Sequence, residues 1–301
     1  LRNWGTPTLR GGSRFDPSLN ARKRIQIFGG GPDRWVQVNH PDVGSVFFDR
    51  NRDGVEDGGF AGLEKLIDAA ETWSAEILNL SPRYNTQEGP NRTFGWLQML
   101  NQGRRVWCVA VSDAHRVFGN GVGGWRTYVP SSTDSPGEID HAEIVRNSKA
   151  GRMMITNGPF LEVTAADGMP IGSTVIAEGA VELQVRVQTP NWMEIDRVQI
   201  LVNGRQPQPY DFRKSERPGM FREGVVTFDE TVEVALQQDA HLIVVAIGEG
   251  SNIEAGWGLN PYGQMHPVAY TNPIFIDVGR DGFEHNGDTL GHPLMTSPAA
   301  D

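Results

Sequence analysis

Residues 106–115 read Val-Trp-Cys-Val-Ala-Val-Ser-Asp-Ala-His, an apolar run that ends in Asp-x-His. The continuous apolar stretch Val106–Val111 is typical of a strand that is buried on both faces of a parallel sheet. Side chains that follow directly after such a strand lie at its carboxyl end, where α/β folds build their sites. The stretch therefore predicts both a parallel sheet and a site at Asp113 and His115.

The segments around this run alternate between strand and helix patterns. Two short apolar runs predict strands, at residues 35–39 and 75–80. Apolar residues spaced three and four positions apart predict helices, at residues 63–73, 93–102 and 138–150. This alternation predicts an α/β unit with a parallel sheet over residues 35–158. Residues 1–34 form an irregular lead-in in this interpretation, in which residues 25–28 could make a short strand.

The pattern changes to short strands after residue 158. Residues 181–188 alternate strictly between apolar and polar side chains, as a strand with one buried face does. Asn203-Gly204 follows an apolar run and is a strong hairpin-turn signal. Further short runs predict strands at residues 197–202, 225–228, 231–236, 242–247 and 274–278. Together they predict a β-sandwich domain over residues 159–280, followed by a tail at residues 281–301.

Composition narrows the classes of partner. The 301 residues carry 27 basic and 37 acidic side chains, so the formal net charge is 27 − 37 = −10. An acidic chain argues against a broad nucleic-acid or anionic-membrane surface. No apolar run approaches the length of a membrane span, so we expect neither nucleic acid nor membrane as a partner. Cys108 is the only cysteine, which excludes an internal disulfide and leaves the compartment undetermined.

A histidine also follows the first predicted strand, in Asn39-His40-Pro41. On its own, Asp-x-His more often reflects a turn-capping aspartate beside a surface histidine. Two strand ends that offer His40, Asp113 and His115 favour a metal site instead, because imidazole nitrogen and carboxylate oxygen are common metal ligands. Glu76 could add a third strand-end group, or it could be the polar residue of a half-exposed strand.

A second candidate metal site lies in the Asp- and Gly-rich segment at residues 49–57. Its Asp-x-Asn-x-Asp-Gly pattern matches the opening of a calcium loop, in which alternating oxygens converge on the ion. Phe60 occupies the twelfth position, where an EF-hand has glutamate, so the segment is not an EF-hand. A calcium loop of another type and a plain solvated turn fit the residues about equally. A calcium loop would favour a periplasmic or secreted protein. Its ligands would be Asp49, Asn51, Asp53 and Asp57.

Several short motifs, taken in order, resemble the later half of the PHP (polymerase and histidinol phosphatase) metallohydrolase domain. More narrowly, they are similar to the CehA/McbA type, named for carbaryl hydrolase. The resemblance covers roughly residues 35–280. The motifs are Asn39-His40-Pro41, Glu76-Ile77-Leu78-Asn79, Ser112-Asp113-Ala114-His115, Arg126-Thr127-Tyr128-Val129, Thr156-Asn157-Gly158-Pro159-Phe160 and Thr271-Asn272-Pro273-Ile274.

The resemblance implies a distorted seven-stranded β/α barrel that holds two or three divalent metals, followed by a β-sandwich. His40, Asp113 and His115 would be metal ligands, and zinc, manganese and iron all suit such a set. The metals would activate a water for attack on a phosphoester, ester or carbamate-type bond of a small-molecule substrate. Four residues would lie near the site, and the two arginines among them would either assist an anionic substrate or make structural hydrogen bonds. These four are Glu76, Asn79, Arg116 and Arg126.

The chain departs from the family at its start. PHP domains begin with a His-x-His strand, but of the seven histidines here only His40 precedes the Asp-x-His motif. The first half of a barrel is therefore missing, and three explanations are open: a C-terminal piece of a longer protein, an inactive truncated relative, or replacement of the early strands by residues 1–34. We expect a second polypeptide segment or a homo-oligomer mate to cover the open sheet edge. The alternative function is an inactive PHP-like binding or scaffold module with a structural calcium loop.

Overall fold

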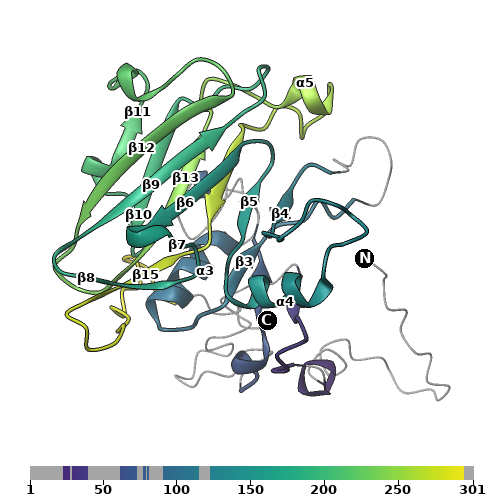
Figure 1. The fold of residues 1–301 in the computed structure, drawn as a ribbon, viewed down its shortest axis with the longest axis vertical. Coiled ribbons are helices and arrows are strands. Elements are labelled where there is room, and N and C mark those ends of the chain that lie inside the picture. Colours follow the sequence, from purple (N-terminus) through teal and green to yellow (C-terminus); the bar gives the residue numbers. More distant parts are fainter. Residues whose placement is uncertain are drawn as a thin grey trace, which may run out of the picture.

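The structure is a computed structural model, and it describes residues 23–27, 29–39, 62–72, 77–78, 80, 91–114 and 123–294. Over these residues the fold is mixed α/β, with many strands and few helices (Figure 1). The strands form a three-stranded, an eight-stranded and a four-stranded sheet. We call them the parallel sheet, the large sheet and the small sheet. None of the three closes into a barrel within the ranges just given.

The parallel sheet contains β1 (Gln37–Val38), β2 (Ala69–Glu71) and β3 (Trp107–Val109) in that spatial order. Both strand pairs are parallel, and Val38, Ala70 and Cys108 lie in register. Every residue of β2 and β3 is buried. The parallel sheet predicted from residues 106–111 is thus confirmed, and the carboxyl ends of its strands lie at one edge.

The helix predicted over residues 63–73 is wrong. Residues Glu64–Leu66 form only a 3-10 turn, η1, and β2 follows directly. Asp68 explains the difference, because it fixes the chain in an extended form. Its carboxylate accepts from the backbone N–H of Val36 at 2.7 Å and its carbonyl accepts from Trp107 N at 2.9 Å. Pairing with two neighbouring strands therefore outweighs the helical spacing of the apolar residues.

Two other local predictions also fail near the parallel sheet. Residues 23–27 are helical where a short strand was expected at residues 25–28, and Ile25 packs against Leu63 and Ile67. Residues 77–78 form a 3-10 turn in place of the strand predicted at residues 75–80. Both segments are short apolar runs, for which periodicity alone does not separate strand from helix.

Two helices match their predictions in position and differ by a few residues at the ends. α3 spans Arg92–Asn101 and is capped by Asn91, whose Oδ1 accepts from the N–H of Phe94 at 2.8 Å. α4 spans His141–Lys149 and is capped by the Asp140 carboxylate. All but the first residue of α3 are buried, so this helix is part of the core. α4 has an exposed outer face, since only Ser148 is buried in it.

The large sheet is built mostly from antiparallel strands. Its path runs β11-β10-β13-β14-β5-β4, and β15 pairs with both β13 and β8. β14 and β15 lie beside the same strand, β13, and are separated by Asn272-Pro273. Its strands are β4 (Arg126–Tyr128), β5 (Met154–Thr156), β8 (Thr174–Ala177), β10 (Arg197–Val202), β11 (Asp211–Arg213), β13 (Ala240–Ile247), β14 (Val268–Thr271) and β15 (Ile274–Val278).

The small sheet has the order β12-β9-β6-β7 and is antiparallel throughout. The two runs predicted at residues 225–228 and 231–236 belong to one strand, β12, with a register shift between Val226 and Phe228. The strands are β6 (Phe160–Ala165), β7 (Met169–Pro170), β9 (Ala180–Gln188) and β12 (Val226–Ala235). The short helices of this half are η3 (Ala166–Gly168), η4 (Gln208–Tyr210), η5 (Pro218–Met220) and α5 (Glu254–Trp257).

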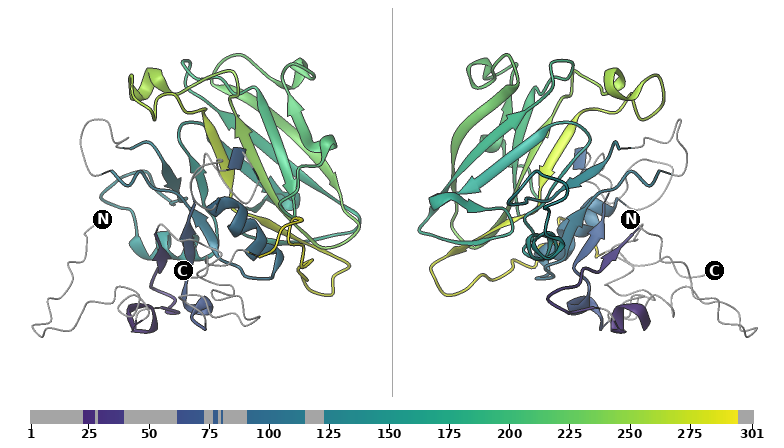
Figure 2. Two further views of the ribbon diagram at one scale, coloured as in Figure 1. Left: turned by 180° about the vertical axis from the view of Figure 1, so that it is seen from behind. Right: turned by 45° about the vertical axis from the view of Figure 1, so that its right-hand side comes forward.

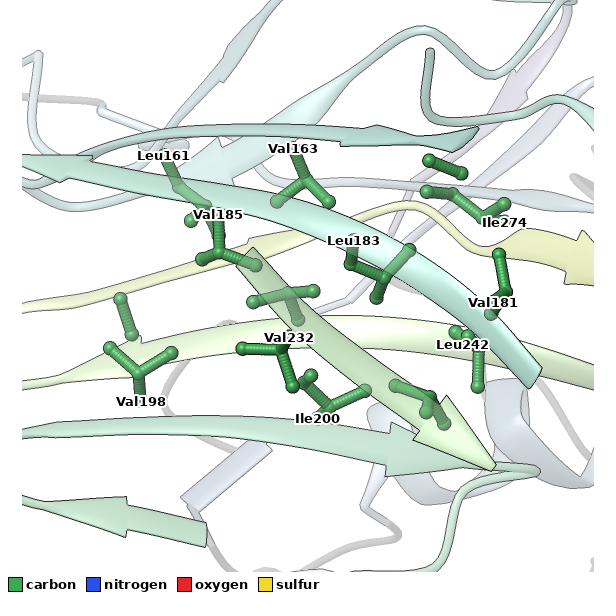
Figure 3. Packing of buried hydrophobic residues seen from close by; sticks show 14 of the residues in the cluster. Leu161, Val163, Val181, Leu183, Val185, Val198, Ile200, Val232, Leu242 and Ile274 are labelled. Atoms are coloured by element: carbon green, nitrogen blue, oxygen red, sulfur yellow. The ribbon is translucent and has the colours of Figure 1, made fainter. Parts of the chain in front are cut away.

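The large and small sheets face each other across one apolar layer (Figure 3). The strict alternation in β9 is confirmed, since Val181, Leu183, Val185 and Val187 are buried and the residues between them are exposed. Opposite them lie side chains of β10, β13 and β15, such as Val198, Ile200, Leu242 and Ile274. Burial of this layer removes apolar surface from water and holds the two sheets together.

The large sheet is also covered on its other face, so it is the middle of three layers (Figure 2). In β13, which is buried at every position, Leu242 and Val244 face the small sheet, whereas Ile243 and Val245 face α3 and the parallel sheet. The predicted boundary at residues 158 and 159 falls between β5 of the large sheet and β6 of the small sheet.

Candidate functional site

The candidate site is the edge of the parallel sheet at which its strands end. Residue 40 follows β1 through Asn39, Glu71 is the last residue of β2, and Asp113 follows β3 by four residues. β2 lies between the other two strands, so the three chain segments emerge side by side. Neighbouring strands are about 4.8 Å apart, so β1 and β3 are about 10 Å apart.

Most residues of the sequence-predicted site lie outside the described residues. This applies to His40 and His115, to Glu76, Asn79 and Arg116, and to the calcium-loop candidates Asp49, Asn51, Asp53 and Asp57. Among the residues that the structure does describe, no three His, Cys, Asp or Glu side chains are grouped to hold a metal ion. Of the predicted ligands, the structure therefore places Asp113 alone.

Asp113 is exposed and its backbone has φ +43°, in the left-handed region. This conformation costs roughly 1–2 kcal/mol for an L-residue, although aspartate tolerates it better than most. Strained backbone of this kind persists only where the surrounding structure imposes it, and it is frequent at functional sites. This left-handed residue lies four positions past the end of β3, at the carboxyl edge of the parallel sheet.

Glu71 is an acidic residue at this edge that the sequence analysis missed. It is only 1% exposed and lies in register with Val109 of β3. A carboxyl group buried to this degree is expensive unless other groups in the protein compensate for it. The sequence analysis missed Glu71 because the spacing of apolar residues at 63–73 predicts a helix. Had residues 69–71 been predicted as a buried parallel strand, Glu71 would have been a candidate site residue at its carboxyl end.

A second missed feature is a buried polar cluster made by Thr72, Cys108 and Tyr270. The Oγ1 of Thr72 lies 2.6 Å from the thiol of Cys108 and 2.7 Å from the hydroxyl of Tyr270. All three residues are fully buried. The cluster joins Cys108 of β3 and Thr72, the residue after β2, to Tyr270 in β14 of the large sheet.

Three of the motif residues bind backbone groups. Asn272 contacts the backbone of β3 at Cys108, and Thr127 contacts the backbone of Ala110, the residue that follows β3. Asn157 extends the pairing of β5 with β14, because its Oδ1 accepts from Val268 N at 2.7 Å and its Nδ2 donates to His266 O at 2.8 Å. These polar side chains are buried or partly buried, and each compensates backbone groups that would otherwise be unpaired.

Arg126 is the one predicted site-proximal arginine that the structure describes. Its Nη1 donates to the carbonyl of Gly123 at 2.7 Å, and its guanidinium lies 5.8 Å from the ring centroid of Tyr128. This hydrogen bond stabilises the backbone at Gly123, just before β4. A role of Arg126 toward an anionic substrate stays a prediction.

Comparison with known proteins gives no independent assignment. No model of a known protein family matches the chain, and no curated protein matches its sequence. Among the described residues, no helix is both long enough and apolar enough to cross a bilayer.

Proposed function

We propose that the chain is a metal-dependent hydrolase, or the C-terminal part of one, with its metal site at the carboxyl edge of the parallel sheet. The observation that carries the proposal is the order β1-β2-β3, with all three strands parallel. This order brings the segment that leads into His40 and the segment that carries Asp113 and leads into His115 to one edge. Active sites of open α/β sheets lie at this edge.

The donor set suits a divalent transition metal. Two imidazoles and one carboxylate are ligands that zinc, manganese and iron accept. A bound ion of this kind supplies a hydroxide-like water at neutral pH and stabilises the negative charge that develops on the substrate. Asp113 is an exposed acidic residue at this edge, and Glu71 is a second acidic residue at the same edge. The substrate class is a phosphoester, ester or carbamate-type bond in a small molecule.

The proposal includes a fold, namely part of a PHP-like β/α barrel followed by a β-sandwich. Among the described residues, β1 pairs with β2 alone, so β1 is the outer strand on its side. The other side, along β3, is occupied by side chains of the large sheet. A second polypeptide segment or a homo-oligomer mate that completes the barrel would therefore add its strand beside β1, since unpaired strand edges recruit partners.

Metal analysis of purified protein tests the proposal. Wild type should retain zinc, manganese or iron after dialysis and should cleave p-nitrophenyl phosphate, p-nitrophenyl acetate or a naphthyl carbamate. Asp113→Ala and His115→Ala should lose both properties, while Asp134→Ala, which alters another exposed aspartate, should keep them. Equal metal content and equal activity in wild type and Asp113→Ala would refute the proposal.

The side-chain contacts along β3 favour one second candidate, an inactive PHP-like binding or scaffold module with calcium in the loop at residues 49–57. Side chains occupy the edge of β3 that faces away from β2, so no further barrel strand can pair with β3 at that edge. This candidate predicts that Ca²⁺ raises the melting temperature of wild type but not of Asp53→Ala. It also predicts no retained transition metal and no hydrolysis of the three substrates.

A further inference from the structure

Among the strands that the structure describes, β3 pairs with β2 alone. Trp107 N donates to Asp68 O at 2.9 Å, and Val109 O accepts from Thr72 N at 2.9 Å. Successive residues of a strand direct their backbone groups to opposite sides, so Cys108 and Ala110 face away from β2. Both residues are buried, and buried backbone groups are nearly always paired.

Two side chains of the large sheet take the place of a neighbouring strand. Asn272 accepts from Cys108 N at 2.7 Å through Oδ1 and donates to Cys108 O at 2.9 Å through Nδ2. Its amide group thus pairs as a peptide group would. Thr127 does the same for Ala110 with a single hydroxyl, which accepts from Ala110 N at 3.0 Å and donates to Ala110 O at 2.9 Å.

These contacts fix the chain three residues before Asp113. The left-handed φ of Asp113 is unfavourable, so the adjoining backbone must be held in place to keep it. Thr127 holds the upstream side at Ala110, and its neighbour Arg126 holds the downstream side at Gly123 with a 2.7 Å hydrogen bond. Adjacent residues of β4 therefore hold the backbone at Ala110, three residues before Asp113, and at Gly123.

We infer that Thr127 and Asn272 are positioning residues for Asp113: they set the end of β3 so that the Asp113 carboxylate is aimed at the metal. The inference rests on the proposed metal site and extends it to residues that do not touch the ion. If Thr127 and Asn272 had a purely structural role, their substitution would lower the stability of the protein and leave its metal affinity unchanged.

Two variants of Thr127 separate the effect of its hydroxyl from the effect of its shape. Thr127→Val keeps the shape of the side chain and removes the hydroxyl, whereas Thr127→Ser keeps the hydroxyl. Thr156→Val is the matched control, because the buried hydroxyl of Thr156 also makes two bonds, accepting from Gly158 N at 2.8 Å and donating to Pro159 O at 2.6 Å. It loses as many side-chain hydrogen bonds as Thr127→Val, but these bonds go to Gly158 and Pro159 and none goes to Ala110 or Cys108.

The experiment measures Zn²⁺ affinity by competition with a chromophoric chelator, on the full chain and well below each melting temperature. It also records the visible spectrum of the Co²⁺-loaded protein. Thr127→Val should lose about tenfold or more in affinity, as residues that orient metal ligands typically do, and its Co²⁺ spectrum should change. Thr127→Ser and Thr156→Val should stay within about threefold of wild type, with the wild-type spectrum.

Asn272→Ser gives an independent second test, since it removes the contacts to Cys108 and should weaken Zn²⁺ binding in the same direction. Wild-type affinity and an unchanged spectrum in Thr127→Val would overturn the inference, and so would an equal loss in Thr156→Val. If wild type and Asp113→Ala bind Zn²⁺ equally, the proposed metal site itself fails. If instead Asp113→Ala loses Zn²⁺ and Thr127→Val keeps it, the metal site stands and only the positioning role of Thr127 fails.

Discussion

The Nε2 of His241 lies 2.9 Å from the Oδ1 of Asn101, in the buried layer between β13 and α3. Asn101 in turn donates to the carbonyl of Asn203 at 3.1 Å, so its Oδ1 is an acceptor and His241 donates. The Nδ1 of His241 has no partner among the described residues. Burial lowers the pKa of His241 from 6.5 to about 3, because the charged imidazolium would have no solvent around it.

This shift predicts a loss of stability in acid. The folded-state pKa is lower than the unfolded one, so the unfolded chain binds the proton first as the pH falls. The stabilisation is complete above pH 6.5 and is lost between pH 6.5 and about 3, by about 1.4 kcal/mol per pH unit. Urea unfolding at pH 7.5 and 5.0 should show wild type losing about 2 kcal/mol more than His241→Gln. Parallel losses in both proteins would contradict this prediction.

Gly124 and Trp257 should be energetically coupled. A Cβ atom on Gly124 would lie 1.0 Å from the Cη2 atom of Trp257, so Gly124→Ala must displace the indole ring. We expect Gly124→Ala to lower the free energy of unfolding by about 1–3 kcal/mol. Most of that loss should disappear when Trp257→Ala is also present, which a double-mutant cycle in urea measures.

Gly123→Ala is the control for that cycle. Gly123 has φ +75° and nothing lies within 4 Å of the added Cβ, so its cost of about 1 kcal/mol should come from the backbone alone. Its coupling to Trp257→Ala should be near zero. Equal coupling for both glycines would show that steric contact is not the cause.

Lys149 should stabilise the contact between α4 and the parallel sheet. Its Nζ lies 2.6 Å from the Oδ1 of Asp68, and both side chains are at most 20% exposed. Lys149→Met should lower the free energy of unfolding by about 2 kcal/mol, because the partly buried carboxylate of Asp68 would lose its hydrogen-bonded cation. Lys214→Met, which breaks the exposed pair with Glu194, should cost less than about 1 kcal/mol in the same urea assay.

The proposed metal site predicts a metal-dependent stability. An ion that binds only the folded chain, at a hundred times its dissociation constant, adds about 2.7 kcal/mol to the free energy of unfolding. EDTA should therefore lower the melting temperature of wild type and leave Asp113→Ala unchanged. If neither EDTA nor added Zn²⁺ changes the melting temperature of wild type, the result would argue against the proposed metal site.

Local pattern was sufficient for several elements. The alternation of β9 predicts which of its residues are buried, and the continuous apolar run of β13 predicts burial on both faces. Asn203-Gly204 predicts the tight turn, in which both residues have positive φ and Val202 and Arg205 exchange hydrogen bonds of 3.0 and 2.9 Å. Each of these depends on residues that are neighbours along the chain.

The candidate site was predictable in part for the same reason. That Asp113 comes just after a buried strand follows from residues 106–113 alone. The burial of Glu71 did not follow, because the spacing of residues 63–73 fits a helix, and only pairing with β1 and β3 makes residues 69–71 a strand.

The sequence by itself thus determined the buried faces of β9 and β13, the two helices α3 and α4, and the polar end of β3, since period and capping are local properties. Only the tertiary structure decided that β2 lies between β1 and β3 and that Asn272, 164 residues away, closes the edge of Cys108. Hydrogen bonds between distant segments leave no periodic trace in the chain. They form because buried N–H and C=O groups must find partners wherever the packed layers bring them.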